Sequence, residues 1–169
     1  MADKPLQWIF ARRSIRKFYS NPVEDEKVDL ILQAAMAAPS ANNAKPWHFI
    51  VVKNRQTLDQ IAKLHPYAKM CYEATLAIVV CGDPAISKNY WPQDCSAATQ
   101  NILLAGTALG LGTVWLGVHP RVERKGNMKK LFGIPENMEV LAVVAIGYPA
   151  EQKSPRTQFD ASRVHADMW

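Results

Sequence analysis

The chain has 169 residues, of which 49% are hydrophobic and 21% are charged, values typical of one folded domain and unlike a disordered chain. A formal charge of +5 favours an anionic ligand or surface, but it falls short of the basic tail of a nucleic-acid-binding protein. The longest apolar runs have the length of strands, and the N-terminus lacks a basic-then-apolar signal. We therefore predict a cytoplasmic protein without a membrane span.

Hydrophobic periodicity predicts helices interleaved with four strands. A short first helix is expected to end near Arg12, and a second to begin with Asn21 and Pro22 as its cap and first turn and to end before Pro39. The elements expected next are a strand over 47–53, a helix capped by Asn54 and ending at 64, a helical turn over 67–72, a strand over 75–82, a loop over 83–91, the longest helix over 92–112, a strand over 113–118, a basic helix over 122–132 and a strand over 139–148.

The predicted helices outnumber the strands, and the two alternate unevenly, which indicates an α+β sandwich built around one sheet. The stretch GLGTVW at Gly110 is not a dinucleotide-binding fingerprint, because the third glycine is missing and a strand follows where that motif requires a helix. The tail over 149–169 is polar but carries Phe159, Val164 and Trp169. We expect it to pack against another surface, and a second subunit is the favoured one.

Cysteines and histidines give no sign of a metal centre. Cys71, Cys81 and Cys95 lack CxxC spacing and have apolar or small neighbours, so they are expected to be reduced, mostly buried thiols. The four histidines are far apart in the sequence and have no ligand-type neighbour at metal spacing. We therefore predict that the protein binds no metal.

Two polar segments are candidates for ligand binding. Three arginines, Arg12, Arg13 and Arg16, lie within five residues of one another and repel unless an anion or carboxylates neutralise them. Their forked guanidinium groups suit a phosphate, although cations at the end of a helix also complement its dipole. The loop that precedes the strand at Trp47 reads APSANNAKP and offers several hydrogen-bond donors and acceptors, which indicates either a binding loop or a set of turn formers.

Four motifs taken in order resemble the FMN-dependent nitroreductase family. They are RRSIRKF at 12–18, APSANNAKPWHFIVV at 38–52, AATQNILLAGTALGLGTVWLG at 97–117 and AIGYPAE at 145–151, so the similarity covers essentially the whole chain. The resemblance implies a three-layer α+β sandwich with a central, mostly antiparallel sheet flanked by helices. It also implies an intertwined homodimer of single-domain chains, with one FMN at each end of the interface and the tail over about 150–169 packed on the partner.

The resemblance also implies roles for particular residues. Arg12, Arg13, Ser14 and Arg16 would grip the FMN phosphate and the pyrimidine edge of the ring. Pro39, Ser40, Ala41 and Asn43 would come from the partner subunit and surround the flavin. Leu116 and Gly117 would lie against the ring, with the Gly117 N–H near flavin N5, and Lys153 and Arg156 would contact the phosphate. Tyr90 and Trp91 are either substrate-channel residues or ordinary helix-entry packing.

The implied function is an FMN-dependent oxidoreductase. It would pass hydride from NADH or NADPH through flavin N5 to an electron-poor acceptor, a nitroaromatic or a quinone, by a ping-pong mechanism. No side chain need act as a general acid or base, because solvent can supply protons, so no catalytic residue is predicted. Two alternatives stay open: an enzyme of the same fold with an enone, a flavin or a halophenol as acceptor, and a flavin-binding protein without catalysis. Nucleic acid and membranes are not expected partners.

Overall fold

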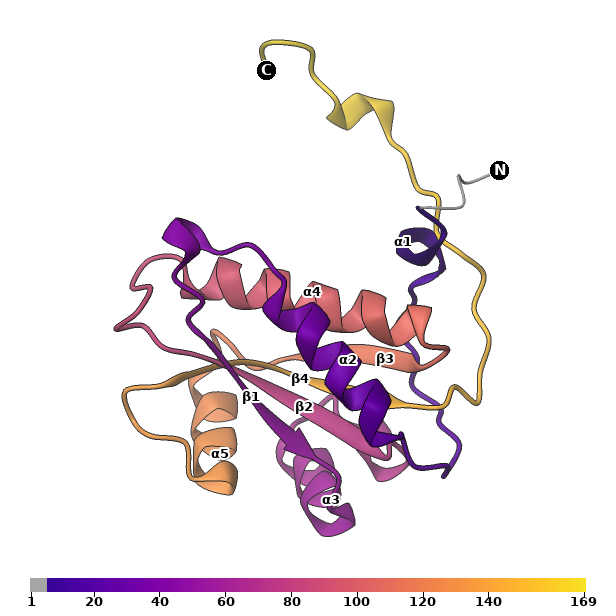
Figure 1. Cartoon of the computed structure of the whole chain (residues 1–169), viewed down its shortest axis with the longest axis vertical. Helices are drawn as coiled ribbons and strands as arrows, with labels where there is room; N and C mark the ends of the chain where they lie inside the picture. Colours follow the sequence, from indigo (N-terminus) through magenta and orange to yellow (C-terminus); the bar gives the residue numbers. More distant parts are fainter. Residues whose placement is uncertain (1–5) are drawn as a thin grey trace.

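A single four-stranded sheet organises the computed structural model, which describes residues 6–169 (Figure 1). The strands are β1 (Trp47–Val52), β2 (Leu76–Gly82), β3 (Gly112–Gly117) and β4 (Glu139–Gly147), and their spatial order is β1-β2-β4-β3. All neighbouring strands run antiparallel. The two central strands are buried almost throughout and consist mainly of β-branched residues and alanine, as expected for strands covered on both faces.

Helices cover both faces of the sheet and give three layers (Figure 1). Helices α2 (Asp25–Met36) and α4 (Trp91–Ala108) pack on one face, where Ile31, Ile102 and Val80 belong to the same buried cluster. Helices α3 (Arg55–Leu64) and α5 (Val122–Phe132) pack on the other face, in a cluster that includes Ile61 and Val79. Because successive strand residues point to opposite faces, one strand serves both clusters. These layers confirm the predicted α+β fold and its antiparallel sheet.

Most predicted elements are present, but the ends of two helices differ from the prediction. Helix α2 begins at Asp25 with Glu24 as its N-cap, so the expected cap at Asn21 and Pro22 is wrong. The Asn21 carbonyl accepts a hydrogen bond from the Thr75 hydroxyl at 3.0 Å, which holds this residue in the preceding loop. Helix α4 ends at Ala108 rather than at 112. Gly110 has a φ of +76°, a left-handed conformation that ends the helix before β3.

The predicted thiols and the predicted cap of α3 are confirmed. Cys71, Cys81 and Cys95 are all free and buried, which confirms that prediction. Asn54 caps α3 by accepting a hydrogen bond from the Thr57 N–H at 3.0 Å, also as predicted. The remaining helical segments are α1 (Gln7–Ala11) and the 3-10 turns η2 (Ala41–Asn43), η3 (Lys69–Tyr72) and η4 (Ala161–Arg163).

The segment after α1 lies along the outer edge of β3. Ser14 forms a parallel bridge with Thr113, and the Ile15 N–H donates to the Thr113 carbonyl at 3.0 Å. Ile15 packs directly on Gly112, where an added Cβ would lie only 2.6 Å from the Ile15 Cγ2. A glycine at this position is therefore what allows the arginine-bearing segment to approach the strand.

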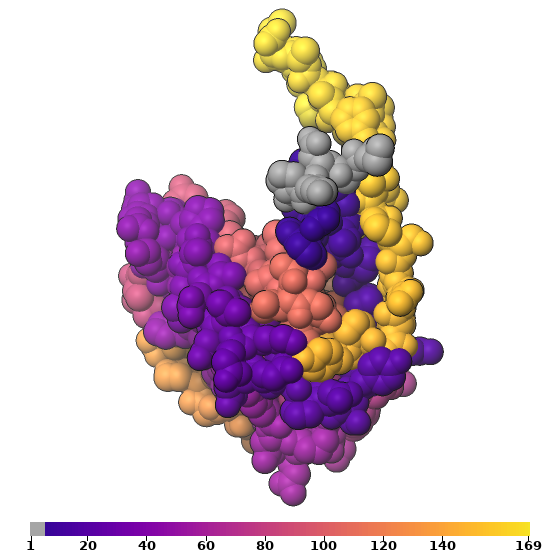
Figure 2. All heavy atoms as spheres, turned by 45° about the vertical axis from the view of Figure 1, so that its right-hand side comes forward, coloured from indigo at the N-terminus to yellow at the C-terminus, as the bar shows by residue number. Residues whose placement is uncertain are grey.

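The tail leaves the body of the molecule after a few contacts with the N-terminal segment. The Ala150 N–H donates to the Lys17 carbonyl at 2.8 Å, and the Arg156 N–H donates to the Phe10 carbonyl at 2.9 Å. Beyond Arg156 the tail extends away from the sheet, as Figure 2 shows, and Phe159 and Trp169 are almost fully exposed. Large apolar side chains thus stand in solvent at the end of an extended arm.

Gly112→Ala is expected to force Ile15 away from β3 and to loosen the arginine-bearing segment. Overpacking of this kind costs about 1–3 kcal/mol of unfolding free energy, measured by chemical denaturation. Gly126→Ala is the matched control, because a Cβ at this exposed position inside α5 meets nothing within 4 Å. It should stabilise the protein by up to about 1 kcal/mol through helix propensity. Equal effects of the two substitutions would contradict this account of Gly112.

Candidate functional site

Cationic side chains gather where the segment after α1 meets the tail. The Lys153 ammonium donates to the Ser14 carbonyl at 2.7 Å, and the Arg13 guanidinium donates to the Ser154 carbonyl. Together with the tie between Arg156 and Phe10, these bonds join the two segments. The cationic cluster consists of Arg12, Arg13, Arg16, Lys153 and Arg156. All five were predicted to hold an FMN. The structure brings them along the outer edge of β3, where Arg13 and Lys153 lie by Gly112 and the Arg16 side chain lies by Gly117.

The cationic cluster has too few carboxylates to neutralise it. Glu151 accepts a hydrogen bond from the Arg16 N–H at 2.5 Å and pairs with Lys153 at 3.1 Å. The hydrogen bond from the Arg16 N–H is the largest cause of the lowered pKa of Glu151. Within residues 6–169, none of the four arginines forms an ion pair. Partial burial and then the charges of Arg156 and Arg13 lower the pKa of Arg12. A bound anion would offset both effects.

A hollow of about 500 Å³ lies along the C-terminal end of β3. Its lining includes Arg16, Leu116 and Gly117, the residues predicted to face a ring. Its volume falls within the range of about 300–1,000 Å³ that is usual for cofactor sites. The remaining lining residues are His65, Pro66, Tyr67, Lys69, Met70, Val114 and Trp115.

The sequence analysis did not identify the part of this hollow formed by His65–Met70. These residues connect α3 to β2 and lie about fifty positions from β3 in the sequence, so no local pattern links the two. The sequence predicts only a helical turn over 67–72 in this region, beside the stretch HPYAKM at 65–70. Its mixture of imidazole, phenol and ammonium groups at a helix end was the available signal, because polar groups at such a place often bind ligands.

His65 is buried and both of its ring nitrogens are occupied. Nε2 lies 2.9 Å from the Gly117 carbonyl, and Nδ1 accepts a hydrogen bond from the Tyr67 N–H at 3.2 Å. A carbonyl can only accept, so Nε2 carries the proton and the ring is neutral. Burial, followed by the charge of Arg124, lowers the pKa of His65 below its ordinary value.

The loop before β1 has an unusual backbone. Asn42, Asn43 and Lys45 all have positive φ values, of 54°, 55° and 52° respectively. Buried Asp94 holds the loop by accepting hydrogen bonds from the Ala41 N–H at 2.9 Å and from the Ser87 hydroxyl at 3.0 Å. A run of residues in the left-handed region is costly and is often found at binding sites, so the backbone adds to the case for a binding loop.

This loop and the cationic cluster lie apart in one chain. Ala41 is bonded to the first turn of α4 through Asp94, whereas Trp8, just before the arginines, lies beside Ala105 and Ala108 near the end of α4. The eleven residues from Asp94 to Ala105 span about 16 Å of helix, and Figure 1 shows η2 and α1 at opposite ends of α4. The predicted loop residues Pro39, Ser40, Ala41 and Asn43 therefore do not join the arginines within a single chain.

The two candidate channel residues have different surroundings. Tyr90 is half exposed at the start of α4. Trp91 is buried, lies against Gly82 and makes an edge-to-face contact with the His119 ring, at 4.9 Å between centroids. Neither residue lines the hollow at the end of β3.

No helix within residues 6–169 is both long and apolar enough to cross a membrane. Over the same residues, no three side chains of histidine, cysteine, aspartate or glutamate come together as a group that could hold a metal ion.

The Nitroreductase family profile matches residues 9–66 and 64–148. The chain belongs to the nitroreductase family. A relative from Archaeoglobus fulgidus, named for NADH dehydrogenase and NAD(P)H nitroreductase activity, is 48% identical over 173 residues and is matched over 99% of both chains. A crystal structure of a protein of the same name from Bacteroides thetaiotaomicron is 44% identical, covers 100% of both chains and has a TM-score of 0.96.

A nitroreductase from Desulfovibrio desulfuricans, solved in complex with FMN, is 32% identical to this nitroreductase family member. It covers 100% of this chain and 99% of its own, with a TM-score of 0.84. These matches confirm the family resemblance and the predicted class of enzyme, an FMN-dependent oxidoreductase. They leave the residue assignments as predictions.

His65 is expected to make the stability of the protein depend on pH. Because the folded state favours the neutral ring, its contribution to the free energy of unfolding is complete above the unfolded pKa of about 6.5 and declines as the pH falls below it. The free energy of unfolding of the wild type should exceed that of His65→Gln by about 1–2 kcal/mol at neutral pH. This difference should be smaller at about pH 5. Chemical denaturation at several pH values measures it, with His48→Gln, at an exposed site on β1, as control. A difference that is constant with pH would contradict a buried neutral ring.

Proposed function

We propose that this chain is an NAD(P)H oxidoreductase whose bound FMN, through N5, takes hydride from the nicotinamide and then passes it to a nitroaromatic or a quinone in a ping-pong cycle. The observation that carries the proposal is the position of Arg16. Its side chain lines the hollow that also contains Leu116 and Gly117, and its N–H is bonded within the cationic cluster. A phosphate site and a ring site therefore adjoin.

The cationic cluster suits the phosphate of FMN. Arg12 and Arg13 provide permanently charged, forked donors, and partial burial together with the neighbouring charges of Arg156 and Arg13 lowers the pKa of Arg12. Lys153 and Arg156 enter the same cluster from the tail. A bound dianion would remove the repulsion among these groups, so phosphate binding should also stabilise the fold.

The hollow at the end of β3 suits the flavin ring. Leu116 and Trp115 offer apolar surface, whereas Arg16 and Lys69 place two cations on its lining. Those cations would favour the electron-rich, reduced form of the cofactor. His65 has both ring nitrogens engaged and so has no free proton-transfer atom. Protons would come from solvent, in keeping with the absence of a predicted acid or base.

The second half of each site is proposed to come from a second copy of the chain. The loop over 39–43 cannot join the arginines of its own chain, and its strained backbone is held in place by Asp94. An apolar face formed by α1, α2 and α4 is open to solvent and includes Trp8, Ile9 and Leu104. A partner packed on this face would bury it, and the extended tail with Phe159 and Trp169 would lie across that partner.

Two alternatives remain beside the main proposal: an enone, a flavin or a halophenol as the natural acceptor, and a flavin-binding protein without catalysis. They differ in measurable ways. The first alternative is tested by the rates of NADH and NADPH oxidation with a panel of nitroaromatic, quinone, enone, flavin and halophenol acceptors, because the natural acceptor class should give the highest rate. Bound FMN with no oxidation of either nicotinamide cofactor would favour the second.

The purified protein is expected to be yellow and to release FMN on heating. Arg12→Gln combined with Arg13→Gln should weaken FMN binding by about 100-fold or more, because each arginine supplies charge-assisted hydrogen bonds. Arg163→Gln is the matched control, since its partner is Asp160 in the distal tail. Fluorescence titration of the apoprotein with FMN measures the effect. Colourless wild-type protein that also fails to bind added FMN would overturn the proposal.

A mixing experiment tests whether two chains share each site. One variant carries Arg12→Gln and Arg13→Gln; the other carries Asn43→Gly, which removes the amide but keeps a residue that tolerates positive φ. Each is expected to bind FMN poorly alone. Mixed dimers formed by joint refolding should recover about half of the wild-type FMN capacity, because one site then has both intact halves. No recovery in dimers verified as mixed would contradict the shared site.

A further inference from the structure

The Gly117 carbonyl at the end of β3 accepts two hydrogen bonds from outside the sheet. His65, the C-cap residue of α3, donates from Nε2 at 2.9 Å, and Arg124 on α5 donates from Nη1 at 2.9 Å. The other end of the same peptide is also held, because the Val118 N–H donates to the Leu141 carbonyl at 3.0 Å. The Gly117–Val118 peptide is therefore fixed from three elements, although glycine itself imposes little conformational restraint.

His65, Arg124 and Tyr67 form a closed arrangement behind Gly117. The Tyr67 N–H donates to His65 Nδ1, and the Arg124 guanidinium lies over the Tyr67 ring at 5.1 Å from its centroid. This cation–π contact orients the guanidinium while it donates to Gly117. Each of the three groups thus restrains another. His65 and Tyr67 line the hollow at the end of β3, and Arg124 bonds to Gly117 in its lining.

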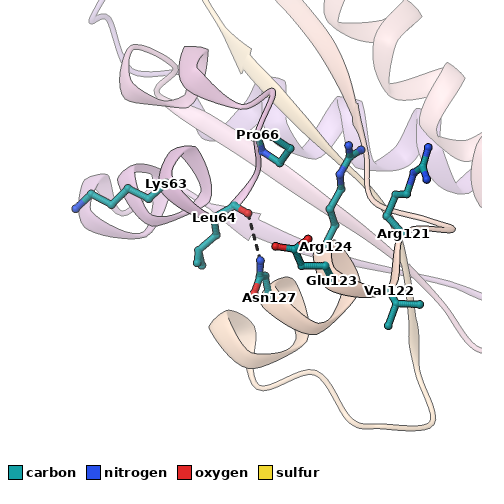
Figure 3. A pocket seen from close by; sticks show the side chains of 8 residues that line it. All are labelled: Lys63, Leu64, Pro66, Arg121, Val122, Glu123, Arg124 and Asn127. Carbon is teal, nitrogen blue, oxygen red and sulfur yellow. Dashed lines mark hydrogen bonds between the residues drawn. The ribbon is translucent and has the colours of Figure 1, made fainter.

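Arg124 also carries a charge that no carboxylate neutralises. In the part of the chain that the structure describes, no acidic side chain lies within ion-pair distance of Arg124. Figure 3 shows Arg121 and Arg124 extending in the same direction from the start of α5. Of these two arginines, Arg124 bonds to the Gly117 carbonyl, whereas the Arg121 side chain makes no hydrogen bond within residues 6–169. The chain therefore provides two neighbouring arginines of which one reaches β3.

We propose that His65 and Arg124 are positioning residues that fix Gly117 beside flavin N5, and that Arg124 also brings a positive charge to this edge of the flavin. The proposal rests on the proposed function, because it requires the ring to lie against Gly117. The fixed Gly117–Val118 peptide restrains the rotation of Gly117 and so helps to keep its N–H, in the preceding peptide, aligned with the reacting atom; small displacements there cost rate. A nearby cation favours the reduced flavin, which carries more negative charge than the oxidised form.

Arg124 variants separate its charge from its hydrogen bond. Arg124→Lys keeps the charge, Arg124→Gln keeps a donor, and Arg124→Met keeps neither. We expect the Gln and Met variants to lower the flavin midpoint potential measurably, and the Met variant to slow flavin reduction at saturating NAD(P)H by about tenfold. The Lys variant should retain a potential close to wild type. Arg121→Gln is the matched control and should leave both quantities unchanged.

His65 is tested in the apoprotein as well as in the loaded enzyme. Nitrogen NMR of the apoprotein should identify the neutral Nε2–H tautomer, and the Gly117 carbonyl carbon resonance should shift in Arg124→Met but not in Arg121→Gln. In the loaded enzyme, His65→Gln, whose amide can still donate, should reduce flavin faster than His65→Leu. A general loss of stability would not produce this rescue, because both variants lose the imidazole.

The outcomes that overturn this inference differ from those that overturn the proposed function. If the wild type binds FMN and oxidises NAD(P)H, but Arg124→Met has wild-type potential and reduction rate, the positioning role is wrong. The same conclusion follows if the NMR spectra show the Nδ1–H tautomer or an unchanged Gly117 resonance in Arg124→Met. If the wild type binds no FMN, the proposed function fails, whereas the NMR results still report whether the bonds to Gly117 exist.

Discussion

The attachment of one short segment to the free edge of β3 determines most of what the molecule presents to a ligand. The bond from Ile15 to Thr113, made possible by Gly112, places Arg13 beside Gly112 at the start of the strand and brings the Arg16 side chain toward Gly117 at its other end. The tail then joins this segment through Lys153 and brings further charge. An edge strand normally exposes unpaired backbone groups, and here that edge is covered by the residues that form the cationic cluster.

Features set by neighbouring residues in the sequence could be predicted, whereas features set by contacts between distant residues could not. The strands and helices follow from local periodicity, and the four strands appear where the sequence indicated them. The start of α2 was misplaced because a bond from Thr75, more than fifty residues away, holds Asn21 outside the helix. The role of His65 could not be found for the same reason, since its partners Gly117 and Arg124 come from distant elements.

The family resemblance supplied what the local pattern could not. Arginines near a helix end are equally compatible with a dipole effect and with a phosphate site, and only the order of four motifs pointed to the second interpretation. The structure adds a physical reason, because among residues 6–169 the five cations of the cationic cluster have one carboxylate partner, Glu151. It also adds the separation between this cluster and the loop over 39–43. Under the proposed function a single chain is then an incomplete site, and a partner would cover the exposed apolar face and the extended tail.

The central claim is that two copies of the chain complete a flavin site that neither completes alone. Native mass spectrometry of the purified protein tests this claim most directly, because it reports chains and cofactors in the same particle. We predict a particle that contains two chains and two FMN molecules, with FMN lost when the chains separate. Single chains that each retain one FMN, or dimers that bind none in the presence of excess FMN, would contradict the account.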